Sequence, residues 1–132
     1  MSCGCNSSLC ETCPPRGYIC VPQGDDCIVV MTVRENDCDG DYFDISGASE
    51  IVFVVADELG GTVRITKKLS LAEIAISTNL YQFYFTVTAT DTAALVRQSN
   101  YFECQVTSAA GIKKTVLTGI FKATDTMIKD LA

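Results

Sequence analysis

The sequence predicts an all-β protein, an antiparallel β-sandwich of about seven strands preceded by a cysteine-rich irregular segment. Short runs of β-branched and aromatic residues recur at intervals of roughly 8–12 residues, which is the spacing of strands in a sandwich. Turns rich in Gly, Asn and Asp separate these runs. Most of the cysteines stand before the first long run, in a stretch with few large apolar residues.

The first half of the sandwich is predicted from two long apolar runs, residues 27–34 and 50–57. Both are rich in β-branched residues, which suit strands packed inside a sandwich. A turn at residues 35–41 and a corner at residues 44–47 separate them. After a reversal at Gly60 and Gly61, residues 62–67 alternate in polarity. This alternation predicts a half-buried strand with Val63 and Ile65 on one face.

The second half begins with a weaker strand at residues 73–77 and a stronger one at residues 81–88. In the stronger strand Tyr81, Phe83, Phe85 and Val87 face the same way. The period then breaks at residues 90–95. Here we expect one helical turn that crosses between the sheets, capped by Thr90 and with Asp91 at its positive end.

Two further strands complete the prediction, at residues 101–108 and 113–122, joined by a hairpin at residues 109–111. The total of about seven strands is that of an immunoglobulin-like sandwich. We therefore expect the sandwich domain to span residues 26–124, between a cysteine-rich head at residues 1–25 and a tail at residues 125–132. The expected core residues lie at alternate strand positions and are Val52, Val54, Phe83, Phe85, Phe102, Val106, Leu117 and Phe121.

Composition excludes several classes of function. The chain has a formal charge of −6, and its ten Lys and Arg residues are scattered, so a nucleic-acid surface is not expected. No apolar window approaches 18 residues and no signal peptide is visible, so we expect neither a membrane span nor export by a leader. These observations predict synthesis in a cytosol.

The sharpest chemical motif is a set of four thiols in eleven residues, Cys3, Cys5, Cys10 and Cys13. The Cys-x2-Cys pair is typical of half a structural zinc site, and the absence of histidine leaves an all-sulfur site. Zinc is the candidate cofactor, because cytosolic cysteine clusters bind metal more often than they crosslink. Disulfides formed in an oxidising medium, or unliganded thiols at an interface, are the alternatives. Cys20 and Cys27 are further thiols that can pair or extend the cluster.

An enzyme is not expected. A Ser, Thr or Cys nucleophile requires a partner base, and the chain has no histidine to supply one. The sequence also lacks a Gly-rich phosphate-binding loop. Cys104 stands between Phe102 and Val106 on the inward face of a predicted strand, where a free cysteine acts as a small hydrophobe.

Several short motifs carry a resemblance to a known family: Asp44-Ile-Ser-Gly-Ala48, Thr88-Ala-Thr-Asp-Thr-Ala-Ala-Leu95, Asn100-Tyr-Phe102 and Leu117-Thr-Gly-Ile-Phe121. With these motifs, residues 26–124 resemble the small β-sandwich of tailed-bacteriophage structural proteins, and most closely the N-terminal domain of the phage baseplate upper protein. The cysteine-rich head is not part of the family pattern, and residues 96–99 replace its usual Gly-containing approach to the Tyr.

The resemblance implies a non-enzymatic virion component of a tail, baseplate, fibre anchor or capsid, made in the host cytoplasm and acting by protein–protein assembly. Its implied partners are other virion proteins, including further copies of itself. The residues themselves leave a second interpretation open. In that interpretation the chain is a stand-alone cytosolic metal-binding module, with the cysteine-rich head as its functional part and an attached β-domain.

Overall fold

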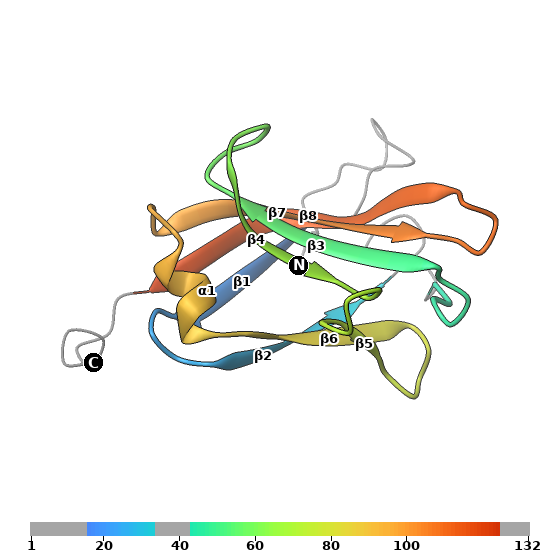
Figure 1. Cartoon of the computed structure of the whole chain (residues 1–132). Coiled ribbons are helices and arrows are strands. Elements are labelled where there is room, and N and C mark those ends of the chain that lie inside the picture. Colours follow the sequence, from blue (N-terminus) through green and yellow to red (C-terminus); the bar gives the residue numbers. More distant parts are fainter. Residues whose placement is uncertain (1–15, 34–42, 125–132) are drawn as a thin grey trace.

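The structure is a computed structural model, and it describes residues 16–33 and 43–124. These residues form two β-sheets packed face to face, with a short helix at one end (Figure 1). The elements in chain order are β1 (Arg16–Pro22), β2 (Cys27–Thr32), β3 (Glu50–Ala56), β4 (Val63–Lys68), β5 (Ala75–Ile76), β6 (Gln82–Val87), α1 (Ala89–Ala93), β7 (Ser99–Thr107) and β8 (Lys113–Thr124).

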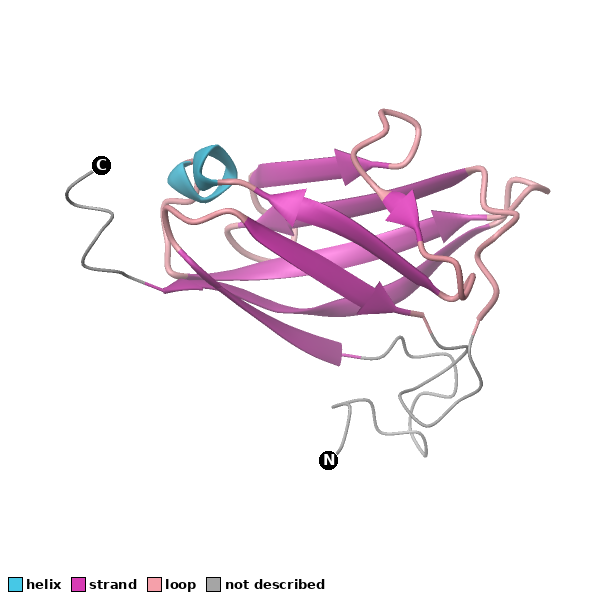
Figure 2. Ribbon diagram, turned by 90° about the horizontal axis from the view of Figure 1, so that it is seen from below, coloured by secondary structure: helices cyan, strands magenta, loops and turns pink. Residues whose placement is uncertain are grey.

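The larger sheet has five strands in the order β1-β8-β7-β3-β4, and the smaller has three in the order β2-β6-β5. Figure 2 shows the two layers from below. Every pairing is antiparallel except that of β1 with β8, which is parallel. The prediction of a mostly β protein with two packed sheets is confirmed. The described residues contain eight strands where about seven were expected, and the larger sheet is mixed, not antiparallel, because β1 joins β8 in parallel.

β1 lies in a stretch that the sequence analysis included in the irregular head. It pairs with β8 over its whole length, from Arg16 opposite Thr118 to Pro22 opposite Thr124. Val21 is buried in the core, and Ile19 packs against it. The described sandwich therefore begins ten residues earlier than residue 26, because β8 provides a ladder that a Gly- and Cys-containing strand can join at the sheet edge.

The core is centred on four phenylalanines that join the two sheets. The ring of Phe53 on β3 lies 4.4 Å from that of Phe85 on β6, across the sandwich. Phe102 and Phe121, on the next two strands of the same sheet, lie 5.7 and 6.2 Å from Phe53 between ring centroids. The expected burial of Phe83, Phe85, Phe102, Val106 and Phe121 is confirmed, and Leu117 packs against this core while remaining partly exposed.

The phase of β3 differs from the prediction. Ile51, Phe53 and Val55 are fully buried, whereas Val52 and Val54 are half-buried on the opposite face. The predicted core positions Val52 and Val54 are therefore wrong by one residue. An uninterrupted apolar run contains no alternation, so its inward phase cannot be read from the strand itself.

Two β-bulges shift the phase of other strands. Ile65 lies opposite Val55 but Val63 lies opposite Ala56, so Arg64 is the extra residue between them. Val63 and Ile65 consequently lie on opposite faces, contrary to the expectation from alternation. A similar shift between β7 and β8 leaves Val116 as an extra residue, and its side chain is buried.

α1 crosses from β6 of the smaller sheet to β7 of the larger, as predicted for this segment. Its N-cap is Thr88, two residues earlier than the predicted Thr90. Thr88 and Asp91 form a capping box, in which each side chain accepts a hydrogen bond from the other residue's backbone N–H. Lys67 on β4 lies 2.8 Å from the carboxylate of Asp91, so an ion pair ties the helix to the larger sheet.

Candidate protein-binding surface

The outer face of the five-stranded sheet carries an apolar row that crosses all five strands. Directly opposed residues of neighbouring strands point to the same face. The strand registers place Tyr18, Ile120, Tyr101, Ala56 and Val63 opposite one another in that order, from β1 to β4. We call these five residues the apolar row. At a strand spacing of about 4.8 Å the row is roughly 19 Å long.

Much of the apolar row is accessible to solvent. Tyr18 is 62% exposed, Val63 51% and Tyr101 37%. Leu59, in the turn between β3 and β4, adds a side chain that is 81% exposed beside the row. Contiguous exposed apolar surface of this kind is typical of protein-binding sites, since isolated apolar residues are common on surfaces but ordered strips are not.

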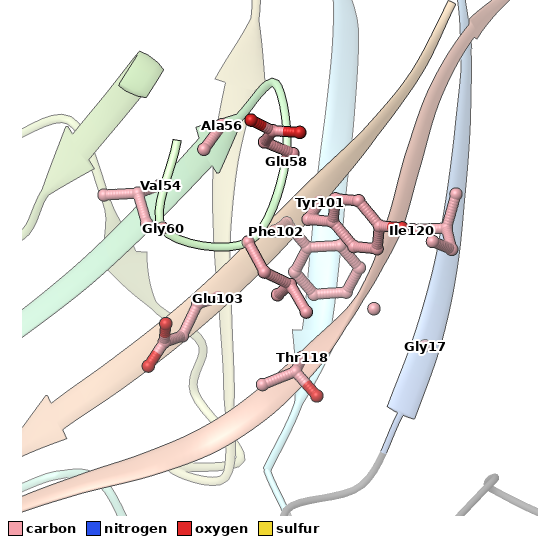
Figure 3. A pocket seen from close by; sticks show the side chains of 12 residues that line it. Gly17, Val54, Ala56, Glu58, Gly60, Tyr101, Phe102, Glu103, Thr118 and Ile120 are labelled. Atoms are coloured by element: carbon pink, nitrogen blue, oxygen red, sulfur yellow. The ribbon is translucent and has the colours of Figure 1, made fainter. Parts of the chain in front are cut away.

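A shallow hollow of about 360 Å³ lies over the middle of the row. Figure 3 shows Tyr101 and Ile120 side by side in it, with the carboxylates of Glu58 and Glu103 on different sides. The lining is mainly apolar and includes Val54, Ala56 and Leu59. The hollow thus offers an apolar floor with acidic groups at its margin, which suits a side chain of a partner protein.

The turn between β3 and β4 forms one wall of the hollow and is held by an ion pair. Gly60 has a φ of +72°, a conformation that favours glycine, and this permits the tight reversal. Arg64 then donates hydrogen bonds to Asp57 from Nε, at 3.0 and 3.2 Å to the two carboxylate oxygens, and from Nη2 at 2.9 Å. These hydrogen bonds hold the pKa of the Asp57 carboxyl below its usual value. Because the turn is tied at both ends, the wall has a defined position.

Charged residues stand on either side of the apolar row. On β8, Lys122 follows Ile120 by two residues, so it lies on the same face just beyond the row, opposite Cys20 and Ser99. On β7, Glu103 follows Tyr101 by two residues and lies on the opposite side of the row from Lys122, opposite Thr118. The Glu103 side chain is exposed and accepts a 3.0 Å hydrogen bond from the hydroxyl of Thr115. On β8 and β7 the face therefore presents Lys122, an apolar strip and Glu103 in sequence along the strand direction, while Glu58 in the turn between β3 and β4 lies on the other side of the hollow from Glu103.

Two glycines allow β1 to pack closely at the edge of this face. Gly17 and Gly119 are opposed in the parallel ladder. A Cβ atom on Gly119 would overlap the carbonyl oxygen of Gly17, so only glycine fits there. A Cβ on Gly17 would lie 3.3 Å from Cζ of Phe102, whose ring packs beneath the strand. This close approach brings Tyr18 into line with the rest of the row.

A second apolar patch lies on the outer face of the three-stranded sheet. It consists of Ile28, Val30 and Tyr84, which are 71%, 56% and 43% exposed. Val30 and Tyr84 are directly opposed, and Ile28 lies opposite Thr86. This patch is smaller than the apolar row, and its opposed neighbours in the ladder, Thr86 and Ala75, are uncharged.

The predicted zinc ligands Cys3, Cys5, Cys10 and Cys13 lie outside the described residues, as do the predicted turn at residues 35–41 and the tail at residues 125–132. Of the further thiols, Cys20 is exposed on β1 and Cys27 is partly buried on β2, and both are free. They lie in different sheets and are not joined to each other. Within residues 16–33 and 43–124, no three Cys, Asp or Glu side chains are grouped as a metal site would require.

Cys104 is fully buried on β7, as predicted. Burial raises the pKa of its thiol well above the usual value, and the neighbouring charge of Glu103 raises it further. A protonated, inaccessible thiol cannot act as a nucleophile. Cys104 therefore contributes to packing.

The apolar row was not predicted from the sequence. It joins residues from five strands, and only the registers between those strands bring them into line. In the part of the chain that the structure describes, no helix has the length and hydrophobicity needed to cross a bilayer. No protein-family model matches the chain, and no curated protein is significantly similar to it.

Proposed function

We propose that the protein is a non-enzymatic structural component of a tailed-phage virion that works by protein–protein assembly. The observation that carries this proposal is the apolar row, an exposed strip that crosses a whole sheet and is hollowed at its centre. Such a surface lowers its free energy when a second protein covers it. The phage context rests on the sequence resemblance, which is an analogy between folds and motifs.

The fold we propose for the sandwich is immunoglobulin-like, and the order of the strands supports it. In such folds one sheet runs C′-C-F-G and the other D-E-B. Here β4-β3-β7-β8 corresponds to the first order and β5-β6-β2 to the second. β1 then takes the place of a first strand that has joined the larger sheet beside the last one. Immunoglobulin-like sandwiches commonly act as rigid bodies that present binding surfaces.

The motifs behind the resemblance have structural roles in this chain. In the corner at residues 44–48, Asp44 accepts a 2.8 Å hydrogen bond from the backbone N–H of Ser46, and Ile45 is buried. In the second motif, Thr88 and Asp91 cap α1. Asn100 is buried in β7 and donates a 3.0 Å hydrogen bond to the carbonyl of Arg97. The motifs therefore support a shared fold, and the binding surface has to be argued from other residues.

The cysteine-rich head would serve this function as an anchor. Four thiols in eleven residues can hold one zinc ion and so order a segment that has few large apolar residues of its own. Protein purified under reducing conditions should then carry about one zinc per chain, and Cys10→Ser should remove it. Disulfide bonds among these cysteines, without bound metal, would show that oxidation orders the head instead.

The proposed function is tested on phage particles whose genome encodes the chain. Quantitative mass spectrometry of purified particles should find the protein at a fixed copy number per particle, in proportion to other structural proteins. Immunogold labelling should then place it at one location in the virion. Absence from purified particles, with the protein present in the infected cell, would overturn the assignment.

A further inference from the structure

We infer that two copies of the chain pair through the outer face of the five-stranded sheet, with a two-fold axis along the apolar row. The inference deepens the proposed assembly function and rests on it, because it names the first partner as a second copy and gives the geometry.

The dimer covers the apolar row of each copy with that of the other. A two-fold axis lying along the row, between the molecules, places each apolar row over the row of the second copy. Tyr18, Tyr101 and Val63 then leave water together with their symmetry mates. Two sheets stacked in this way keep their strand directions within about 30°, about 10 Å apart, as in the interior of a sandwich. The apolar surface alone, however, does not fix the partner or the orientation.

The charges on β7 and β8 favour one orientation. Rotation about this axis reverses the strand direction, so the side of the row that carries Lys122 meets the side that carries Glu103. In the ladder Lys122 lies two residues beyond Ile120, and Glu103 lies opposite Thr118, two residues before Ile120. Lys122 of each copy is thereby brought beside Glu103 of the other. The symmetry produces two such pairs, and neither Lys122 nor Glu103 faces its own symmetry mate.

Lys122 and Glu103 are too far apart to pair within one chain. Lys122 is opposed to Ser99, which lies four residues from Glu103 along β7. At about 3.4 Å per residue the two positions are some 14 Å apart. An effect that depends on both charges must therefore arise between molecules.

The smaller patch of Ile28, Val30 and Tyr84 has no charged neighbours of this kind in the described ladder. Its opposed neighbours are Thr86 and Ala75, so the described ladder provides no charge to select an orientation. It supplies a matched control, because Ile28 is more exposed than any member of the apolar row.

The experiment measures the mass of the full chain in solution by sedimentation equilibrium over a range of concentrations. The wild-type protein should form dimers. Glu103→Lys and Lys122→Glu should each weaken dimerisation at least tenfold, because each places two like-charge pairs across the axis. An equimolar mixture of the two variants should form heterodimers with near wild-type affinity, since both pairs are then of opposite charge. The doubly exchanged variant should dimerise with itself.

Two further variants separate this surface from general stickiness. Tyr18→Ser should weaken the dimer, whereas Ile28→Ser should leave it unchanged. Both side chains are on outer faces, and circular dichroism should show that all variants are folded. Monomers at every concentration, or dimers that ignore charge reversal and show no rescue on mixing, would overturn the inference.

These results are distinguishable from those that bear on the proposed function. A monomeric protein that is nevertheless found in phage particles would remove the dimer and leave the virion role. A charge-dependent dimer absent from phage particles would remove the virion role and leave the dimer.

Discussion

Both faces of the five-stranded sheet carry apolar residues, but only those of one face are covered within the described chain. The inner face packs its phenylalanines against the smaller sheet, with Phe53 4.4 Å from Phe85. The outer face exposes the apolar row. β3 contributes apolar residues to both, since Ile51, Phe53 and Val55 point inward and Val52 and Val54 outward. Continuous apolar strands are characteristic of sheets covered on both sides, which is why we propose that another molecule covers the outer face.

The largest expected effect comes from truncating the inner face. Phe53→Ala should lower the free energy of unfolding by about 3–5 kcal/mol, because it leaves a cavity among three other phenylalanine rings. Chemical denaturation of the purified variant measures the loss. Val54→Ala, one residue away on the outer face, is the matched control and should cost less than about 1 kcal/mol in the monomer. Equal losses at the two positions would break the distinction between the faces.

A smaller effect is expected where the edge strand joins the sheet. Gly119→Ala forces β1 away from β8, because the added Cβ meets the carbonyl of Gly17, and it should cost about 1–3 kcal/mol. It should also weaken dimerisation, since Tyr18 leaves the row.

Gly47→Ala serves as the control for this substitution. Nothing lies within 4 Å of a Cβ at Gly47, so stability and association should both be unchanged. Normal dimerisation of the Gly119→Ala variant would show that β1 has no part in the outer surface.

The smallest effect is expected at the Asp91 carboxylate, which caps α1 and pairs with Lys67 at one end of the sandwich. Partial burial works to raise the pKa of Asp91, but hydrogen bonds from Lys67 and from the backbone N–H of Thr88 outweigh it and lower the pKa below 3.8. A carboxyl with a lowered pKa in the folded state stabilises the fold above its unfolded pKa, and this contribution is lost as the pH falls through the folded pKa. Asp91→Asn should therefore cost about 1 kcal/mol at pH 7.

The pH dependence gives this prediction a distinctive signature. The difference in unfolding free energy between wild type and Asp91→Asn should shrink as the pH is lowered from 6 to below 3.8, the usual value for the group. Urea denaturation at a series of pH values measures it, and Lys67→Met should reduce the same pH dependence. A constant difference across this range would mean that the ion pair does not stabilise the fold.

Local patterns predicted the elements that depend on local sequence. The alternation in residues 81–88 gave the correct inward face, with Phe83, Phe85 and Val87 buried. The break at residues 90–95 marked the crossover, although the cap lies at Thr88. By contrast, the phases of β3 and β4 depend on a bulge and on partner strands, and these leave no signature in a single strand.

The features that form the proposed binding surface were the least accessible to sequence reasoning. β1 contains Gly17, Cys20 and Pro22, a composition that predicts no strand, and it is stabilised by pairing with a strand about one hundred residues away. The apolar row depends on that pairing. A usable signal was present in Tyr101 and Ile120, apolar residues out of phase with the inward positions of their strands.

The parallel pairing of β1 with β8 has a mechanical consequence. β1 begins opposite Thr118 and ends opposite Thr124, so the backbone enters this pair at one end of the sheet and leaves it at the other. A pulling force applied through the chain before Arg16 and after Thr124 would slide the two strands along each other. It would load their hydrogen bonds together, in shear, instead of opening them one at a time. A sandwich connected in this way resists extension along its length, which is the direction of load for a module strung between two larger bodies.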